Sequence, residues 1–103
     1  MRRVVRSKTY VRQLKTLIEY GVKRFGLRVA ESKLLILDDV IEHFLAAHPG
    51  AKQVDPELML HVYPISRTPF VLIYDFDAVE LRLHFIIQAR ADRSSLDPGD
   101  VER

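Results

Sequence analysis

Residues 58–88 read LMLHVYPISRTPFVLIYDFDAVELRLHFIIQ, and this stretch decides the fold. Apolar side chains recur at every second position, first at Leu58, Leu60 and Val62 and again over residues 81–87. That period is typical of a strand with one buried face. Between them lies FVLIY, which is apolar throughout, as a central strand covered on both faces would be. Short turn-prone breaks at 66–69 and 77–78 predict a three-stranded antiparallel meander.

The alternation in the last strand predicts which side chains face inward and which face outward. Those expected to pack against the rest of the chain are Leu81, Leu83, Phe85 and Ile87. Those expected on the outer face are Arg82, His84, Ile86 and Gln88. Arg67 in the first turn and Arg90 after the last strand border the same face. We therefore expect an outer surface that is free for a partner and has arginines at its rim.

The segment before the meander has the pattern of a helical hairpin. Ser7 is a good cap for a helix over residues 8–25, because its hydroxyl can accept from the free amides of the first turn. Gly26 ends that helix, and a second helix is predicted over residues 29–47. Two helices so close in sequence double back and lie on the sheet. Residues 2–6 can add a first strand, so the predicted class is α+β: an N-terminal strand, a helical hairpin and a three-stranded antiparallel meander.

Length and composition predict one cytoplasmic domain over residues 1–103. The apolar content of 48% is ordinary for a globular protein, and no apolar run is long enough to span a bilayer. The start of the chain lacks the apolar core of a signal peptide. Zero cysteines exclude disulfides and thiolate metal sites. The tail over residues 89–103 is polar, and we expect it to become ordered only when something binds it.

The charges are distributed unevenly along the chain. Residues 1–28 hold nine Lys/Arg and one acid, whereas the remaining residues hold seven bases and thirteen acids. This split predicts a basic surface near the N-terminus, available to an acidic protein partner or to nucleic acid. The alternative is a solvated helix face whose charges serve solubility.

Few residues have the spacing of a catalytic site. The sequence lacks a serine or cysteine nucleophile elbow, a phosphate-binding glycine loop and a metal-ligand pair on one helix. Arg67, Arg82 and Arg90 are suited to phosphates or carboxylates, unless they are three unrelated solvated arginines. His84 can act as an acid or a base, although a strand histidine is more often a polar position of a half-wet sheet.

Several motifs resemble those of the RelE/ParE superfamily of toxins from bacterial type II toxin–antitoxin modules. They are Glu19-Tyr20-Gly21 with Phe25-Gly26, His48-Pro49-Gly50, Tyr74-Asp75 and the QARAD run at 88–92. The resemblance implies growth arrest, a role in plasmid stabilisation, and a cognate antitoxin whose extended C-terminal segment wraps the toxin. It also implies that operator DNA is bound only through the antitoxin, and it implies no cofactor or metal.

The superfamily divides by target. RelE-like members cut messenger RNA in the ribosome, and that reading would place Arg67, Arg82, His84 and Arg90 around the scissile phosphate. However, the arginine expected within residues 70–73 is missing, and residues 88–92 offer neither Tyr nor His. The resemblance therefore favours the ParE type, which inhibits DNA gyrase by binding. The candidates for target binding are Arg67, Arg82, His84, Gln88, Arg90 and Arg93. The candidates for antitoxin binding are Arg12, Lys15, Lys23 and Arg24.

Overall fold

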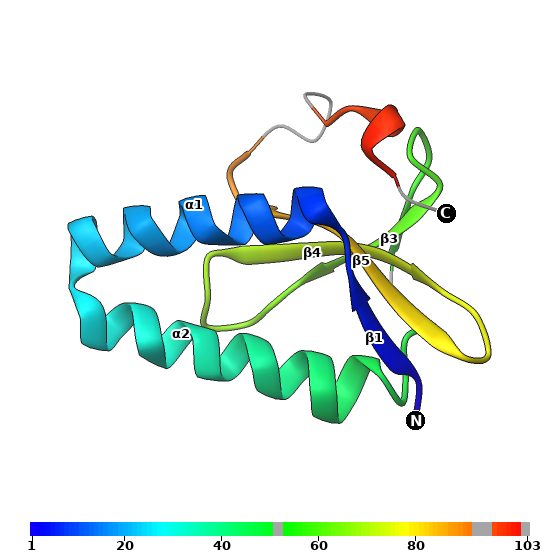
Figure 1. Ribbon diagram of the computed structural model, residues 1–103, viewed down its shortest axis with the longest axis horizontal. Coiled ribbons are helices and arrows are strands. Elements are labelled where there is room, and N and C mark those ends of the chain that lie inside the picture. The colour runs from blue at the N-terminus through cyan, green and yellow to red at the C-terminus, as the bar shows by residue number, and fades with distance from the viewer. Residues whose placement is uncertain (51–52, 92–95, 102–103) are drawn as a thin grey trace.

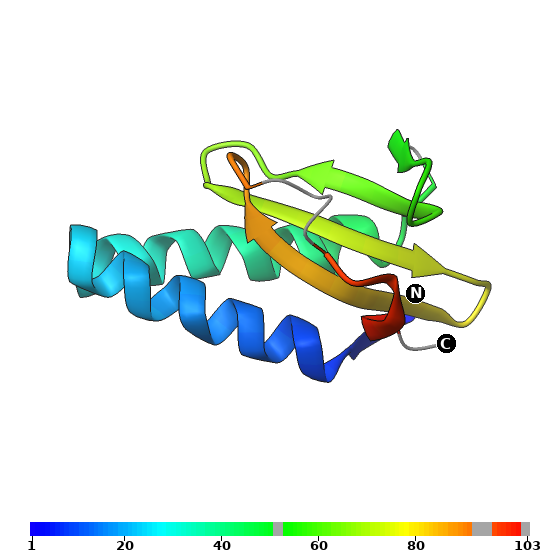
Figure 2. The same cartoon turned by 90° about the horizontal axis from the view of Figure 1, so that it is seen from above.

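The computed structural model describes residues 1–50, 53–91 and 96–101, in which a five-stranded sheet carries a helical hairpin on one face (Figures 1 and 2). The strands are β1 (Arg3–Arg6), β2 (Gln53–Asp55), β3 (Leu60–Pro64), β4 (Phe70–Phe76) and β5 (Glu80–Gln88). Their order across the sheet is β1-β5-β4-β3-β2. Strand β1 runs parallel to β5, and every other pair is antiparallel. The predicted α+β class and order of elements are confirmed.

The hairpin consists of α1 (Lys8–Phe25) and α2 (Leu27–Val40), followed by a π-turn, η1 (Ile41–Leu45). Ser7 caps α1 as predicted, because its Oγ accepts from the backbone N–H of Tyr10 at 2.9 Å. Gly26 separates the helices with φ 94°, a value that L side chains rarely adopt. The second helix starts and ends earlier than predicted. Its last turn is wider, since Ala46 N–H reaches the carbonyl of Ile41.

The meander has one more strand than predicted. Strand β2, which was not predicted, pairs with β3. A turn separates them because the Asp55 Oδ1 accepts from the backbone N–H of Glu57 and of Leu58, both at 3.0 Å. The chain leaves this turn through Met59, at φ 57°. Strand β3 therefore starts at Leu60 rather than two residues earlier.

A β-bulge in β5 overturns the predicted faces of that strand. Tyr74 pairs with Leu83 and Ile73 pairs with Phe85, which leaves His84 unpaired. One extra residue reverses the alternation downstream. Leu81, Leu83 and Ile86 therefore belong to the helix-side core, whereas Phe85 and Ile87 pack on the opposite face. The prediction was wrong for residues 85–88, since a two-residue period in sequence does not reveal an inserted residue.

The sheet consequently has a core on each side. On the helix side, the buried residues are Tyr10, Leu37, Ile41, Leu45, Ile65, Phe70, Leu72, Tyr74, Leu81, Leu83 and Ile86. On the far side, they are Leu58, Leu60, Val62, Val71, Ile73, Phe85 and Ile87.

The far face is covered rather than free. Leu96 and Val101 pack against its buried residues, so the expectation of a free outer face was wrong for the described residues. Figure 1 shows this C-terminal segment (red) and α2 on opposite sides of the sheet. The physical reason is the bulge: it turns Phe85 and Ile87 onto this face, and so large an apolar surface needs cover from water.

Candidate functional site at the end of the helical hairpin

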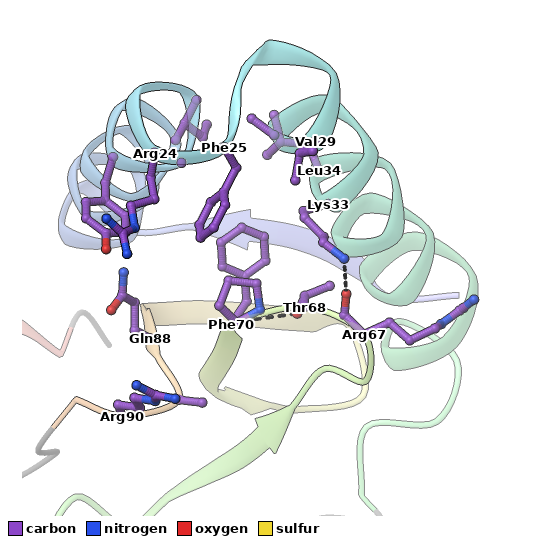
Figure 3. Close-up of a pocket in the computed structure, with 16 residues that line it drawn as sticks. Arg24, Phe25, Val29, Lys33, Leu34, Arg67, Thr68, Phe70, Gln88 and Arg90 are labelled. Carbon is purple, nitrogen blue, oxygen red and sulfur yellow. Dashed lines mark hydrogen bonds between the residues drawn. The ribbon is translucent and has the colours of Figure 1, made fainter.

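A pocket of about 650 Å³ lies where the end of the hairpin meets the end of the sheet (Figure 3). The last two turns of α1 and the first two turns of α2 form one wall. The β3–β4 turn and the end of β5 form the other. Three segments far apart in sequence thus contribute to one concave surface.

The centre of the pocket is apolar. Phe70 is 6% exposed and belongs to the helix-side core. Phe25 faces it from the end of α1 and is 61% exposed (Figure 3). Tyr20 and Val29, which also line the pocket, are large apolar residues in contact with solvent. Exposed apolar side chains gathered at one place are typical of an interaction site.

The rim of the pocket is cationic. It carries Arg24, Lys33, Arg67 and Arg90, and none of the described residues that line it is an acid. Within the described part of the chain, no carboxylate pairs with Arg24, Arg67 or Arg90. Their charges are therefore available to an anionic group from outside.

The β3–β4 turn that carries Arg67 is held in place. Lys33 Nζ donates to the carbonyl of Arg67 at 2.6 Å, which ties the turn to α2. Thr68 Oγ1 donates to the carbonyl of Ile65 at 2.9 Å and accepts from the N–H of Phe70 at 3.0 Å. Arg67 itself has φ 65°, in the left-handed region. The wall is thus formed before any ligand arrives.

A second polar cluster lies at the other end of β5, around Arg82. Arg82 Nε donates to the Asp75 Oδ1 at 2.8 Å, and its NH1 donates to Asp77 at 2.8 Å and to Glu80 at 3.4 Å. Glu80 also receives a hydrogen bond from Arg3 of β1. With three carboxylates around it, the Arg82 guanidinium is not available for a phosphate.

These contacts change the acidity of the carboxylates. Hydrogen bonds from Arg82 and from the backbone N–H of Glu80 and Val79 lower the pKa of Asp77 to about 2. Burial alone would raise the pKa of Asp75, but hydrogen bonds from Arg82 and His84 outweigh it and leave the pKa below its usual value. Both groups are therefore charged at neutral pH.

His84 is the bulge residue and is 1% exposed. Its Nε2 lies 2.9 Å from the Asp75 Oδ1, and its Nδ1 has no hydrogen-bond partner among the described residues. Its carbonyl accepts from the Ser7 hydroxyl at 2.9 Å, which joins the bulge to the start of α1. A side chain this buried has no direct access to a substrate.

The structure divides the predicted target-binding residues. Arg67, Gln88 and Arg90 meet at the pocket. Arg82 and His84 do not join them: Gln88 lies six residues beyond Arg82, roughly 20 Å along the strand. The four candidates for a ribonuclease site therefore do not lie around one scissile phosphate: Arg67 and Arg90 are at the pocket, whereas Arg82 and His84 are not. Arg93 lies outside the described residues.

The predicted antitoxin-binding residues divide in a similar way. Arg12, Lys15 and Lys23 are exposed and lie within about 80° of one another around the axis of α1, at about 100° per residue. Arg24 is turned away from them and lines the pocket. The basic helix thus presents one cationic stripe to solvent and one cation to the pocket.

Sequence reasoning missed two parts of the site. Phe25 was given no binding role, but it is largely exposed and lines the pocket. Lys33 drew no attention, because a single lysine on a helix is usually solvated. The available signal was the Phe25-Gly26-Leu27 run, which places large apolar residues at a hairpin tip.

Metal-binding clusters and membrane-spanning helices are two other kinds of functional feature. Among the described residues, no three His, Asp or Glu side chains are grouped to hold a metal ion. None of the described helices combines the length and apolarity needed to cross a membrane.

Comparison with known proteins finds similarity in structure rather than in sequence. No protein-family model and no curated protein matches the chain. A chain in a solved structure of the chromosomal ParDE toxin–antitoxin system from P. aeruginosa superposes with a TM-score of 0.70. The two share 16% sequence identity over 85% of this chain and 96% of that one.

This chain shares the fold of that chain of the ParDE structure. The two chains therefore share an α+β arrangement, although an identity of 16% is too low for their sequences alone to show that similarity. The resemblance found in the motifs and the similarity found in three dimensions agree.

Proposed function

We propose that this chain is the toxin of a type II toxin–antitoxin module and that it acts by binding DNA gyrase. The proposal is supported by the fold shared with the ParDE chain, together with a preformed pocket that has an apolar centre and a cationic rim. Gyrase is a large protein, and a surface with apolar anchors inside a charged rim is suited to docking on a protein. The residues assigned to target binding are Arg67, Gln88 and Arg90.

The exposed stripe of α1 is the proposed antitoxin-binding surface. Arg12, Lys15 and Lys23 are exposed cations on one face of a helix. They would attract an acidic antitoxin segment, and that attraction would weaken as salt concentration rises. Operator DNA would then be bound through the antitoxin, and the free chain would arrest growth in the cytoplasm.

The test separates the two surfaces. The chain is induced alone in bacterial cells, and the purified protein is added to a gyrase supercoiling assay. We expect growth arrest, gyrase–DNA breaks and inhibited supercoiling. Co-expression of the protein encoded beside its gene should relieve the arrest.

Matched charge reversals assign the roles. Arg67→Glu with Arg90→Glu should abolish gyrase inhibition and growth arrest but leave binding of the antitoxin intact. Arg12→Glu with Lys15→Glu should leave gyrase inhibition intact and weaken antitoxin binding. Normal supercoiling at saturating wild-type protein would refute the gyrase target. Cleavage of messenger RNA in a translating extract would instead establish the ribosome and its messenger as the target.

A further inference from the structure

The pocket combines an apolar centre with cations around it, and these two features bind different kinds of chemical group. The rings of Phe25 and Phe70 face each other across an apolar centre (Figure 3). Cations lie on both sides of that centre: Arg24 and Arg90 flank Gln88 on one side and Lys33 lies on the other, whereas the Arg67 side chain points away from the centre (Figure 3). A ligand that fits must therefore bring an apolar group and negative charges on either side of it.

A simple anion would pair with the cations of the pocket but would leave its apolar centre unfilled. A free phosphate would pair with one or two cations and leave the aromatic rings in water. A nucleic-acid strand needs cations spaced along its backbone, whereas Arg24, Arg90 and Lys33 lie around a single hollow. A peptide with carboxylates before and after one bulky apolar residue satisfies both, because its anchor fills the centre while its charges reach the rim.

Charge complementarity also favours the peptide. The described lining residues include four cations and no acid, and three of those cations have no carboxylate partner in the described chain. Burial at the edge of an apolar surface strengthens an ion pair relative to one in open solvent. A basic or neutral peptide would leave these cations unpaired.

We propose that the hairpin-end pocket binds an acidic segment of the target protein, with one bulky apolar side chain inserted between Phe25 and Phe70. Carboxylates flanking that anchor pair with Arg24 and Arg90 on one side and with Lys33 on the other. The proposal rests on the proposed function in one respect, namely that the chain acts by holding a partner protein.

The experiment uses a displayed library of random 12-residue peptides, selected on the full-length chain. We expect the recovered peptides to combine Asp or Glu with Leu, Phe or Trp. Their affinity, measured by fluorescence anisotropy, should fall at least tenfold with Arg24→Glu and with Phe25→Asp. Arg28→Glu, the same charge change at an exposed arginine of α2 that does not line the pocket, should change it less than twofold.

Each outcome decides the proposal. Recovery of no binding peptide, or of peptides without acids, would overturn it, as would equal affinity for the Arg24→Glu and Arg28→Glu variants. A 20-nucleotide single strand that binds at the pocket while the peptides do not would assign the cations to phosphates and would also overturn it. Circular dichroism of each variant distinguishes lost binding from lost folding. Gyrase inhibition is measured separately, so the pocket proposal can fail while the gyrase proposal stands.

Discussion

Removal of the Ser7 hydroxyl should cost more stability than removal of an ordinary helix cap. Ser7 is 4% exposed, and its Oγ serves two partners, accepting from the N–H of Tyr10 and donating to the carbonyl of His84, both at 2.9 Å. Ser7→Ala therefore leaves a helix-end amide and a bulge carbonyl without a partner. Loss of a cap costs about 0.5–2 kcal/mol, and a buried unsatisfied group costs about 1–3 kcal/mol.

Together these effects predict a loss of about 2–3 kcal/mol. For a domain of this size, each kcal/mol lowers Tm by about 4–8 °C, so Tm should fall by roughly 10–20 °C. Urea denaturation followed by circular dichroism measures the free energy of unfolding, and the m-value should not change. Ser32→Ala, the same change at an exposed position of α2, is the matched control and should lie within about 0.5 kcal/mol of wild type.

A loss for Ser7→Ala no larger than for the control would refute the reasoning. It would mean that the connection between the start of α1 and the bulge contributes nothing to stability. An equally large loss in both variants would point to a general helix effect instead.

Three further predictions follow from the packing and the charges. Gly21→Ala should stabilise the chain by about 0.5–1 kcal/mol, because alanine favours a helix and the added Cβ would meet the Ala30 Cβ at an ordinary 4.0 Å. A lower free energy of unfolding in urea would show instead that the packing of the two helices needs the glycine. Val101→Ala should cost about 1 kcal/mol because Val101 packs on the far core, whereas Val79→Ala, at a 65% exposed turn, should cost almost nothing; equal losses would contradict that packing. The carboxylates near Arg82 have a lowered pKa when folded, so the unfolded chain takes up protons first and stability should fall as pH drops from about 4 towards 2. Arg82→Gln should flatten that fall in acid titrations of unfolding, and an unchanged slope would exclude Arg82 as its cause.

The sequence predicted the parts of the fold that depend on local patterns. Ser7 and Gly26 marked the ends of the first helix, and the breaks at 66–69 and 77–78 marked the turns of the meander. Strand β2 was not predicted, because three residues are too few to show the two-residue period of a strand. The faces of β5 were wrong beyond His84, since the register of a strand depends on its neighbour as well as on its own alternation.

The site was less predictable than the fold because it is assembled from distant segments. Arg67, Gln88 and Arg90 were singled out together as neighbours of one sheet face, and they do meet. Their grouping with Arg24 and Phe25 depends on how far the hairpin extends past the sheet, which no local pattern encodes. Arg82 and His84 lie at the other end of β5, where carboxylates hold the Arg82 guanidinium and the His84 side chain is buried, and these surroundings are visible only in three dimensions.

The two cores of the sheet differ in what closes them. Two helices of 18 and 14 residues close one side, whereas in the described chain a few side chains of a turn and of the C-terminal segment close the other. The weaker cover can open while the helices stay in place, so amide hydrogens of the C-terminal segment should exchange far sooner than those in the centre of β4. The molecule would thus pass through a native-like state with one side of its sheet wetted, and its resistance to proteases would depend on that state rather than on complete unfolding.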